Sequence, residues 1–233
     1  MDIIYQISPY AIAYTIPILI TCLGGLYSER SGVVNIGLEG MMIVGSFTCA
    51  LTITRLQASM GANALWMGLL VGMLGGTAIS LLHAIAAVNL NANQVISGTA
   101  INMLASALCI FLARTVTGSG NITIQMGFLR KDIPVLKDIP ILGKVLFSNT
   151  YITTWLVLAI LLFSWFLLYK TKFGLRLRSC GENPNAADAA GVNVYRIRYA
   201  GVLISGACAG LAGAIIIVTY AGEFSGSVSG LGF

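Results

Sequence analysis

The stretch that decides the fold is YAGVLISGACAGLAGAIIIVTYAG, residues 199–222, which has 24 residues and no charged side chain. An α-helix rises about 1.5 Å per residue, so about 20 apolar residues cross the ~30 Å hydrocarbon core of a bilayer. Residues 145–169 form a second uncharged stretch of 25 residues. Both stretches therefore predict membrane-spanning helices.

The composition extends this interpretation to the whole chain. Hydrophobic residues make up 57% of the 233 residues and charged residues only 9%, whereas soluble domains carry about 25% charged residues. Residues 56–113 contain no Asp, Glu, Lys or Arg, which is enough for two spans and a tight connection. The composition argues against a water-soluble enzyme and predicts an integral membrane protein.

Six segments of the chain are apolar on all sides, as is typical of buried or lipid-facing helices. They are residues 8–28, 32–54, 64–88, 94–117, 148–169 and 199–221. The predicted fold is an all-α, polytopic transmembrane helix bundle with about six spans, formed as one domain by residues 1–233. The N-terminal sequence MDIIYQ has no basic region of the kind that begins a signal peptide, so we expect the first span to be retained.

The charges in the connections predict how the spans run. Residues 170–198 hold six Lys or Arg against Glu182 and Asp188, which predicts a cytoplasmic loop. Six continuous spans then place the N-terminus and the loop of residues 118–149 outside. The bias is small, because the inner loops total seven Lys or Arg and the outer loops six. A segment that enters the membrane and leaves on the same side would change which loops lie inside and which lie outside.

Catalytic and metal-binding groups are scarce in this chain. The five cysteines form no CxxC pair, and His83 is the single histidine. We therefore expect no catalytic residue, metal site or cofactor, and a packing or hydrogen-bonding role for His83. The net charge of +5 comes from loops that flank spans, where basic residues meet anionic lipid, so it does not indicate nucleic-acid binding.

A polar island, RLRSCGENPNAADAAG, covers residues 176–191 between the last two apolar stretches. Asn183 is a good N-cap, Pro184 suits the first helical position, and Gly191 suits the left-handed residue that ends a helix. The pattern predicts a stiff helix of about seven residues. A short helix on a basic intracellular loop suits a membrane subunit that docks onto a motor protein.

Two polar clusters interrupt the apolar segments. In SGVVNIGLEGMMIVG, residues 31–45, Asn35 and Glu39 are four residues apart, so we expect them on one helix face. Glycines weaken that helix, and an ionisable residue in a membrane is a functional-site candidate. A glycine-broken helix could line a solute pathway. Alternatively, Glu39 pairs with a buried donor and locks two helices together, and both interpretations stay open.

The second cluster is NLNANQVISGTAIN, residues 89–102. Asn93, Gln94 and Asn102 offer uncharged donors and acceptors that suit a neutral solute. The same residues suit a capped turn between two helices, with Asn93 as the N-cap. Small-residue spacings, such as Gly206 and Gly210, let helices approach closely in lipid. We expect internal packing from them, with a subunit interface as the alternative.

Three motifs together resemble a known family. They are GLYSERSGVVNIGLEGMM (residues 25–42), NANQVISGTAIN (91–102) and GENPNAADAAGVNV (181–194). They are similar to the inner-membrane permease subunits of bacterial ABC importers for branched-chain amino acids, ribose and nucleosides, and most similar to the nucleoside branch. The resemblance covers nearly the whole chain, and it implies a multi-pass protein of the bacterial inner membrane.

The resemblance also implies partners. Two cytoplasmic ATP-binding subunits hydrolyse ATP, a second and related permease chain completes the path, and a substrate-binding protein or lipoprotein delivers cargo outside. Members of the family are longer, so further C-terminal spans are expected. The implied coupling helix, which inserts into the ATPase, is formed by Gly181, Glu182, Asn183, Pro184, Asn185, Ala186, Ala187, Asp188, Ala189, Ala190 and Gly191.

The sequence therefore predicts a permease subunit that imports a nucleoside by alternating access and is not itself an enzyme. The scarcity of charge near the path favours a neutral solute. A simple sugar or a branched-chain amino acid is the alternative within the class. An ATP-independent carrier or channel is the alternative from another class, but it leaves the capped polar loop unexplained.

Overall fold

The computed structural model describes residues 2–132 and 148–226. Six helices in this part of the chain are long and apolar enough to cross a membrane, which confirms the predicted all-α bundle. They are α1 (Asp2–Arg30), α2 (Leu38–Met60), α3 (Asn63–Ala84), α4 (Gln94–Thr117), α5 (Ile152–Lys170) and α8 (Val194–Ile216). Short π-helical turns, Ile85–Asn89 and Ile217–Ala221, extend α3 and α8.

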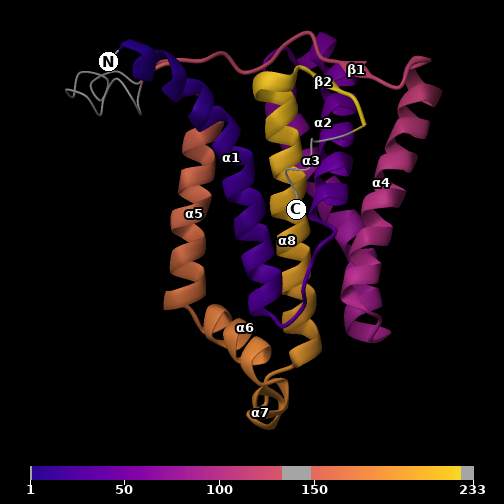
Figure 1. Ribbon diagram of the computed structural model, residues 1–233, viewed down its shortest axis with the longest axis vertical. Coiled ribbons are helices and arrows are strands. Elements are labelled where there is room, and N and C mark those ends of the chain that lie inside the picture. Colours follow the sequence, from indigo (N-terminus) through magenta and orange to yellow (C-terminus); the bar gives the residue numbers. More distant parts are fainter. Residues whose placement is uncertain (1, 133–147, 227–233) are drawn as a thin grey trace.

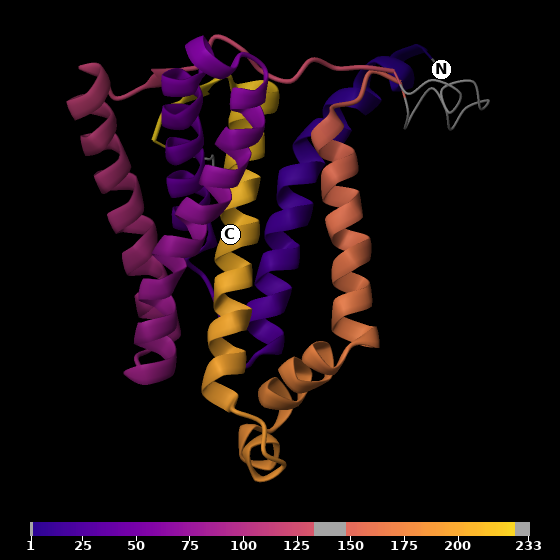
Figure 2. The ribbon, with the colours of Figure 1, turned by 180° about the vertical axis from the view of Figure 1, so that it is seen from behind.

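Helix α8 is the centre of the bundle. It packs against α1, α2 and α3, while α4 leans on α2 at one edge and α5 leans on α1 at the other (Figures 1 and 2). In the most apolar part of α8, 83% of the residues are buried, compared with 22% in the most apolar part of α4 and 28% in that of α5. The two edge helices therefore present most of their apolar surface to the surroundings.

Glycines allow this close packing around α8. A Cβ atom on Gly76 of α3 would lie 2.6 Å from the Cα atom of Gly210, so the two backbones touch directly. A Cβ atom on Gly72 would lie 2.9 Å from the carbonyl oxygen of Gly45 in α2. For these glycines the prediction of internal packing is confirmed.

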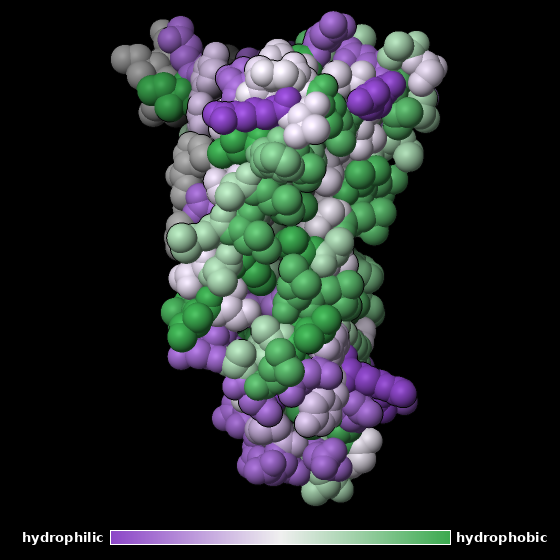
Figure 3. Space-filling view, turned by 90° about the vertical axis from the view of Figure 1, so that its right-hand side faces the viewer, coloured by the Kyte–Doolittle hydropathy of each residue, from purple (hydrophilic) through white to green (hydrophobic). Residues whose placement is uncertain are grey.

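The bundle has two polar ends and an apolar middle (Figure 3). One end holds the N-terminal end of α1, the α2–α3 turn and the described part of residues 118–151 (Figure 1). There β1 (Ile122–Thr123) pairs antiparallel with β2 (Glu223–Phe224). The opposite end holds α6 (Lys172–Glu182) and α7 (Pro184–Ala189). The middle of the loop predicted at 118–149 lies outside the described residues.

The second span begins later than predicted. The chain is not helical over residues 31–37, which we call the unwound segment, and α2 starts only at Leu38. Gly32 has a φ of +85°, which favours glycine, and the Ser28 hydroxyl donates to the Val33 carbonyl at 2.7 Å. The expectation that Asn35 and Glu39 share a helix face is therefore wrong, because Asn35 precedes the helix.

Candidate functional site

The unwound segment needs hydrogen-bond partners, because non-helical backbone within a membrane has no water to bond. Residues of the neighbouring helices supply them. The Gln94 side-chain oxygen accepts from the Val34 N–H at 2.7 Å. The Asn102 amide makes two bonds, accepting from the Gly40 N–H at 2.7 Å and donating to the Ile36 carbonyl at 3.1 Å. Helix α4 thus holds the unwound segment and the start of α2.

His83 of α3 holds the same segment from another side. It is fully buried, with Nε2 at 3.1 Å from the Val34 carbonyl and Nδ1 at 3.0 Å from the Ser97 hydroxyl. A carbonyl can only accept, so Nε2 carries the proton, and in a neutral ring Nδ1 accepts from the hydroxyl. The expected hydrogen-bonding role of His83 is confirmed.

Asn35 connects the unwound segment to the central helix. Its side chain is 8% exposed, donates to the Ser205 hydroxyl of α8 at 3.0 Å, and accepts from the Gly37 N–H at 3.1 Å. Glu39 lies half-buried in the first turn of α2, where the helix dipole favours a negative charge. Four predicted pathway residues, Asn35, Glu39, Gln94 and Asn102, therefore lie on the unwound segment or on the helix turns that adjoin it.

Asn93 lies apart from this group. It is exposed at the start of α4, and its side chain accepts from the N–H groups of Val95 at 3.0 Å and Ile96 at 3.3 Å. The capping interpretation of Asn93 is confirmed. The roles of Ser97 and Ser205 could not be predicted from the sequence, because hydroxyls in membrane helices usually bond to their own helix and give no signal of a distant partner.

The predicted short helix is α7, which projects beyond the end of the bundle (Figure 1). The Asn183 side chain accepts from the Ala186 N–H at 3.1 Å, and Gly191 adopts a φ of +79° after the helix. Both predicted caps are confirmed. Ala187 is buried, while the carboxylates of Glu182 and Asp188 are on exposed residues. The exposed side of α7 offers a surface for another protein.

Helix α6, which precedes α7, contacts the start of the unwound segment. A Cβ atom on Gly181 would overlap the carbonyl of Arg30, and one on Gly32 would lie 3.3 Å from the Gly181 Cα atom. The two backbones therefore touch without a side chain between them. Next to this contact, burial raises the pKa of the Cys180 thiol, and nearby Arg198 partly offsets that rise. We therefore expect Cys180 to react slowly with thiol reagents.

Comparison with known proteins shows which family this chain belongs to. The family described as branched-chain amino acid transport system / permease component matches residues 9–233. The chain belongs to this permease family. It is accordingly a multi-pass protein of the cell membrane and the permease subunit of an ABC transporter. Membership implies that it works with ATP-binding subunits and a substrate-binding protein.

Individual relatives of this permease have more specific names. The chain is 48% identical to the guanosine ABC transporter permease protein NupQ of Bacillus subtilis, over 100% of this chain and 75% of the relative. It is 43% identical to the nucleoside ABC transporter permease protein NupC of Lactococcus lactis, over 94% of this chain and 70% of the relative. A putative glucose ABC transporter permease of Haloferax volcanii, TsgC13, is 36% identical over 87% of this chain and 60% of the relative. No solved structure was found to match the chain.

Proposed function

We propose that this permease imports a nucleoside, and that a separate ATP-binding subunit supplies the energy by hydrolysing ATP. The observation that carries the proposal is the 48% and 43% identity, over nearly the whole chain, to permeases named for guanosine and nucleosides. The site agrees with a neutral solute, because its polar side chains are mostly amides and hydroxyls. Glucose or another simple sugar is the second candidate, on the basis of the 36% identical relative.

The unwound segment is the proposed gate of the solute path. Side chains of α3 and α4 bond to its backbone, and Ser205 of α8 accepts from the Asn35 side chain. A shift of these helices would therefore change which groups of the segment face a solute. Broken helices in transporters present backbone groups and helix ends to solutes near the middle of the membrane. Glu39, Asn35, Asn93, Gln94 and Asn102 remain the proposed residues of the path.

Helix α7 is the proposed coupling helix, and the loop that carries it is proposed to be cytoplasmic. Its caps make it rigid, and α6 touches the turn from which the unwound segment starts. A displacement of α7 by the ATP-binding subunit would therefore reach the unwound segment through backbone contacts. A second, related permease chain is proposed to complete the path, and the described part of residues 118–151 is proposed to face outside.

Uptake by whole cells tests the substrate. Cells that express the complete transporter are compared with cells that lack this chain, using labelled guanosine, glucose, ribose and leucine. We expect the loss of the chain to abolish guanosine uptake and to leave leucine uptake unchanged. Loss of glucose or ribose uptake instead would replace the nucleoside with a sugar.

Reversing the charges on the coupling helix tests its docking. We expect the double variant Glu182→Lys, Asp188→Lys to lose co-purification of the ATP-binding subunit and to lose uptake, because Asp188 in α7 and Glu182 just before it are both exposed. The control is Glu223→Lys, which makes the same change at an exposed position at the opposite end of the bundle. Normal uptake by the double variant would contradict the docking proposal.

A substitution at Gly181 tests the contact between α6 and the unwound segment. In Gly181→Val the new side chain meets the Arg30 carbonyl, so we expect α6 to shift and uptake to fall at least about tenfold, the effect of 1.4 kcal/mol in the relevant equilibrium. ATP hydrolysis by the assembled complex should persist, because the exposed side of α7 is unchanged. The control is Arg176→Val, which introduces the same residue at an exposed position of α6. Equal uptake by the two variants would refute the transmission route.

A further inference from the structure

The unwound segment has one face that packs on the bundle and one face that does not. Burial alternates along residues 31–37, because Ser31, Val33, Asn35 and Gly37 are buried and the residues between them are more accessible. A period of two is that of an extended chain, in which successive side chains point to opposite sides. Val34 is 47% exposed, whereas its neighbours Val33 and Asn35 are 1% and 8% exposed. We call the side of Val34 and Ile36 the open face.

The backbone of Val34 is fixed from two sides. Its N–H donates to the Gln94 side-chain oxygen of α4 at 2.7 Å, and its carbonyl lies 3.1 Å from Nε2 of His83 in α3. A peptide that is bonded at both groups cannot turn its side chain into the bundle without breaking one of these bonds. The exposure of Val34 is therefore imposed by the fold.

Two backbone donors next to Val34 have no partner in the bundle. Within residues 2–132 and 148–226, the N–H groups of Asn35 and Ile36 donate to no acceptor, whereas the N–H of Gly37 donates to the Asn35 side chain. Backbone N–H groups away from water are nearly always paired, because an unpaired one costs free energy. These two donors therefore need an acceptor from outside the described bundle.

The donors lie at the depth of the hydrocarbon core. The Asn35 side chain donates to Ser205, halfway along α8, and the Ile36 carbonyl accepts from Asn102, about two turns into α4. In Figure 1 the chain between α1 and α2 runs from the end near α6 toward the middle of the bundle. Hydrocarbon offers no acceptor, and non-helical backbone at this depth is tolerated only inside protein or beside a water-filled cavity. A helix of another chain has its own backbone bonds satisfied, so water or a polar solute suits the open face best.

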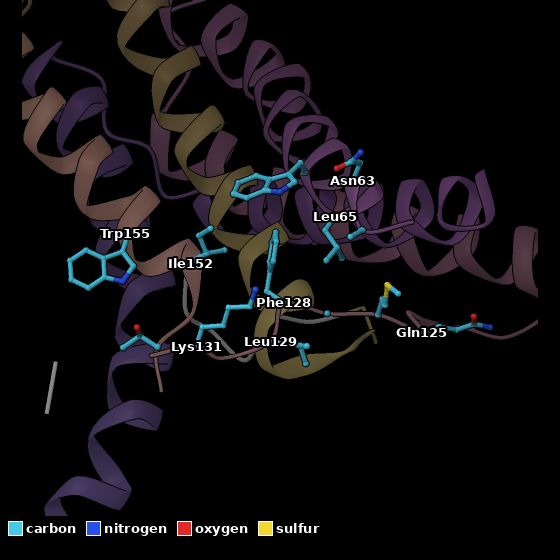
Figure 4. A pocket seen from close by; sticks show the side chains of 13 residues that line it. Asn63, Leu65, Gln125, Phe128, Leu129, Lys131, Ile152 and Trp155 are labelled. Atoms are coloured by element: carbon cyan, nitrogen blue, oxygen red, sulfur yellow. The ribbon is translucent and has the colours of Figure 1, made fainter. Parts of the chain in front are cut away.

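A cavity at the opposite end of the bundle lacks this constraint (Figure 4). It has a volume of about 640 Å³, and Trp66, Phe128 and Thr150 are among the residues that line it. Because it lies at a polar end of the bundle, water can satisfy the backbone of the loop around it. The need for a polar occupant is therefore specific to the unwound segment.

We propose that Val34 is a specificity-determining residue of the solute path, and that its side chain contacts the nucleoside directly. The inference rests on the proposed function, because it takes the solute from it. The face of a nucleoside base is apolar and can lie against the valine methyl groups. The oxygen and nitrogen acceptors of the same solute can bond to the N–H groups of Asn35 and Ile36. Val34 thus supplies an apolar contact beside two donors, which is a combination typical of small-molecule sites.

Cysteine labelling of the complete transporter in permeabilised membrane vesicles tests whether Val34 faces water. The background is Cys22→Ser, because Cys22 is exposed and the other cysteines of the chain are buried. We expect a charged methanethiosulfonate reagent to label Val34→Cys at least about tenfold faster than Phe163→Cys, since the reactive thiolate forms in water and not in hydrocarbon. Phe163 is 62% exposed on the edge helix α5, so it reports exposure to lipid. Guanosine at about ten times its Kd should slow the labelling of Val34→Cys about tenfold.

Transport kinetics test whether Val34 contacts the solute. We expect Val34→Ala to raise KM for guanosine about threefold or more with kcat little changed, because two methyl groups that contact the base are lost. Val34→Ile keeps an apolar, branched side chain and should stay within about twofold of the wild type. Val33→Ala makes the same change at the buried neighbour. It should lower the amount of assembled protein and leave KM unchanged.

The outcomes separate this inference from the proposed function. If the wild type transports guanosine but Val34→Cys is labelled no faster than Phe163→Cys, lipid or another helix covers the open face and the inference is overturned. If Val34→Cys is labelled without protection by guanosine and Val34→Ala keeps a normal KM, the face is wet but does not meet the solute, and the inference is again overturned. In both cases the proposed function stands. If the wild type transports no guanosine, the proposed function and this inference both fail.

Discussion

Gly213→Val is expected to prevent the permease from folding. Gly213 lies in α8, and a Cβ atom there would overlap the carbonyl of Met42 and lie 2.7 Å from its carbonyl carbon. The obstacle is the backbone of α2, which cannot rotate away as a side chain can. Overpacking a tight core costs about 1–3 kcal/mol or more, and α8 packs on α1, α2 and α3 at once. We therefore expect little monodisperse protein after extraction from membranes.

The control for Gly213 is Gly25→Ala in α1. A Cβ atom on Gly25 would lie 3.4 Å from the end of the Leu38 side chain, which is an ordinary contact with a flexible group. Alanine also favours the helix over glycine by about 1 kcal/mol, so this variant should be recovered at least as well as the wild type. Size-exclusion chromatography of the extracted protein compares the two. Similar recovery of Gly213→Val and Gly25→Ala would contradict the tight packing of α2 on α8.

Asn102→Leu is expected to abolish uptake and to destabilise the protein strongly. Leucine has nearly the shape of asparagine but leaves the Gly40 N–H and the Ile36 carbonyl without their side-chain partner. Each buried group left unpaired costs about 1–3 kcal/mol, so the variant should lose about 2–6 kcal/mol. The loss falls where the unwound segment meets α2, so it disturbs the proposed gate directly.

Thr99→Val is the control for Asn102. Thr99 lies about one turn away on α4, is exposed, and bonds through its hydroxyl to carbonyls of its own helix. Its replacement leaves the unwound segment untouched, so uptake and the thermal midpoint should stay near those of the wild type. The thermal unfolding midpoint and the rate of uptake are measured for both variants. An Asn102→Leu protein with a normal midpoint would show that other groups replace the asparagine amide.

The boundaries of α4 could be predicted from the sequence because its ends carry local signals. Asn93 caps the first turn and Gly118 ends the last with a φ of +74°, and the helix spans residues 94–117 as predicted. The same holds for α7 with Asn183 and Gly191. Capping is decided by residues within one turn, so a sequence contains all the information it needs.

The start of α2 could not be predicted in this way. Residues 32–37 are nearly as apolar as the helix that follows, so hydropathy alone extends the span through them. They remain unwound because Gln94, His83 and Asn102, which lie 46 or more positions further along the chain, satisfy their backbone. Only the folded bundle brings those side chains to the segment. The same contacts show which group each of these polar residues bonds to. The sequence showed only that the polar residues lie in two clusters.

By itself, the sequence determined that this is a membrane protein, that six helices within residues 2–132 and 148–226 are long and apolar enough to cross the membrane, and where the short capped helix lies. Those properties follow from composition, span length and capping, which act over neighbouring residues. The tertiary structure decided that α8 is the centre, that Gly181 touches the turn before the unwound segment, and that Trp66 and Thr150 share a cavity. These are contacts between residues far apart in the chain, and the close packing of helices at glycines fixes them.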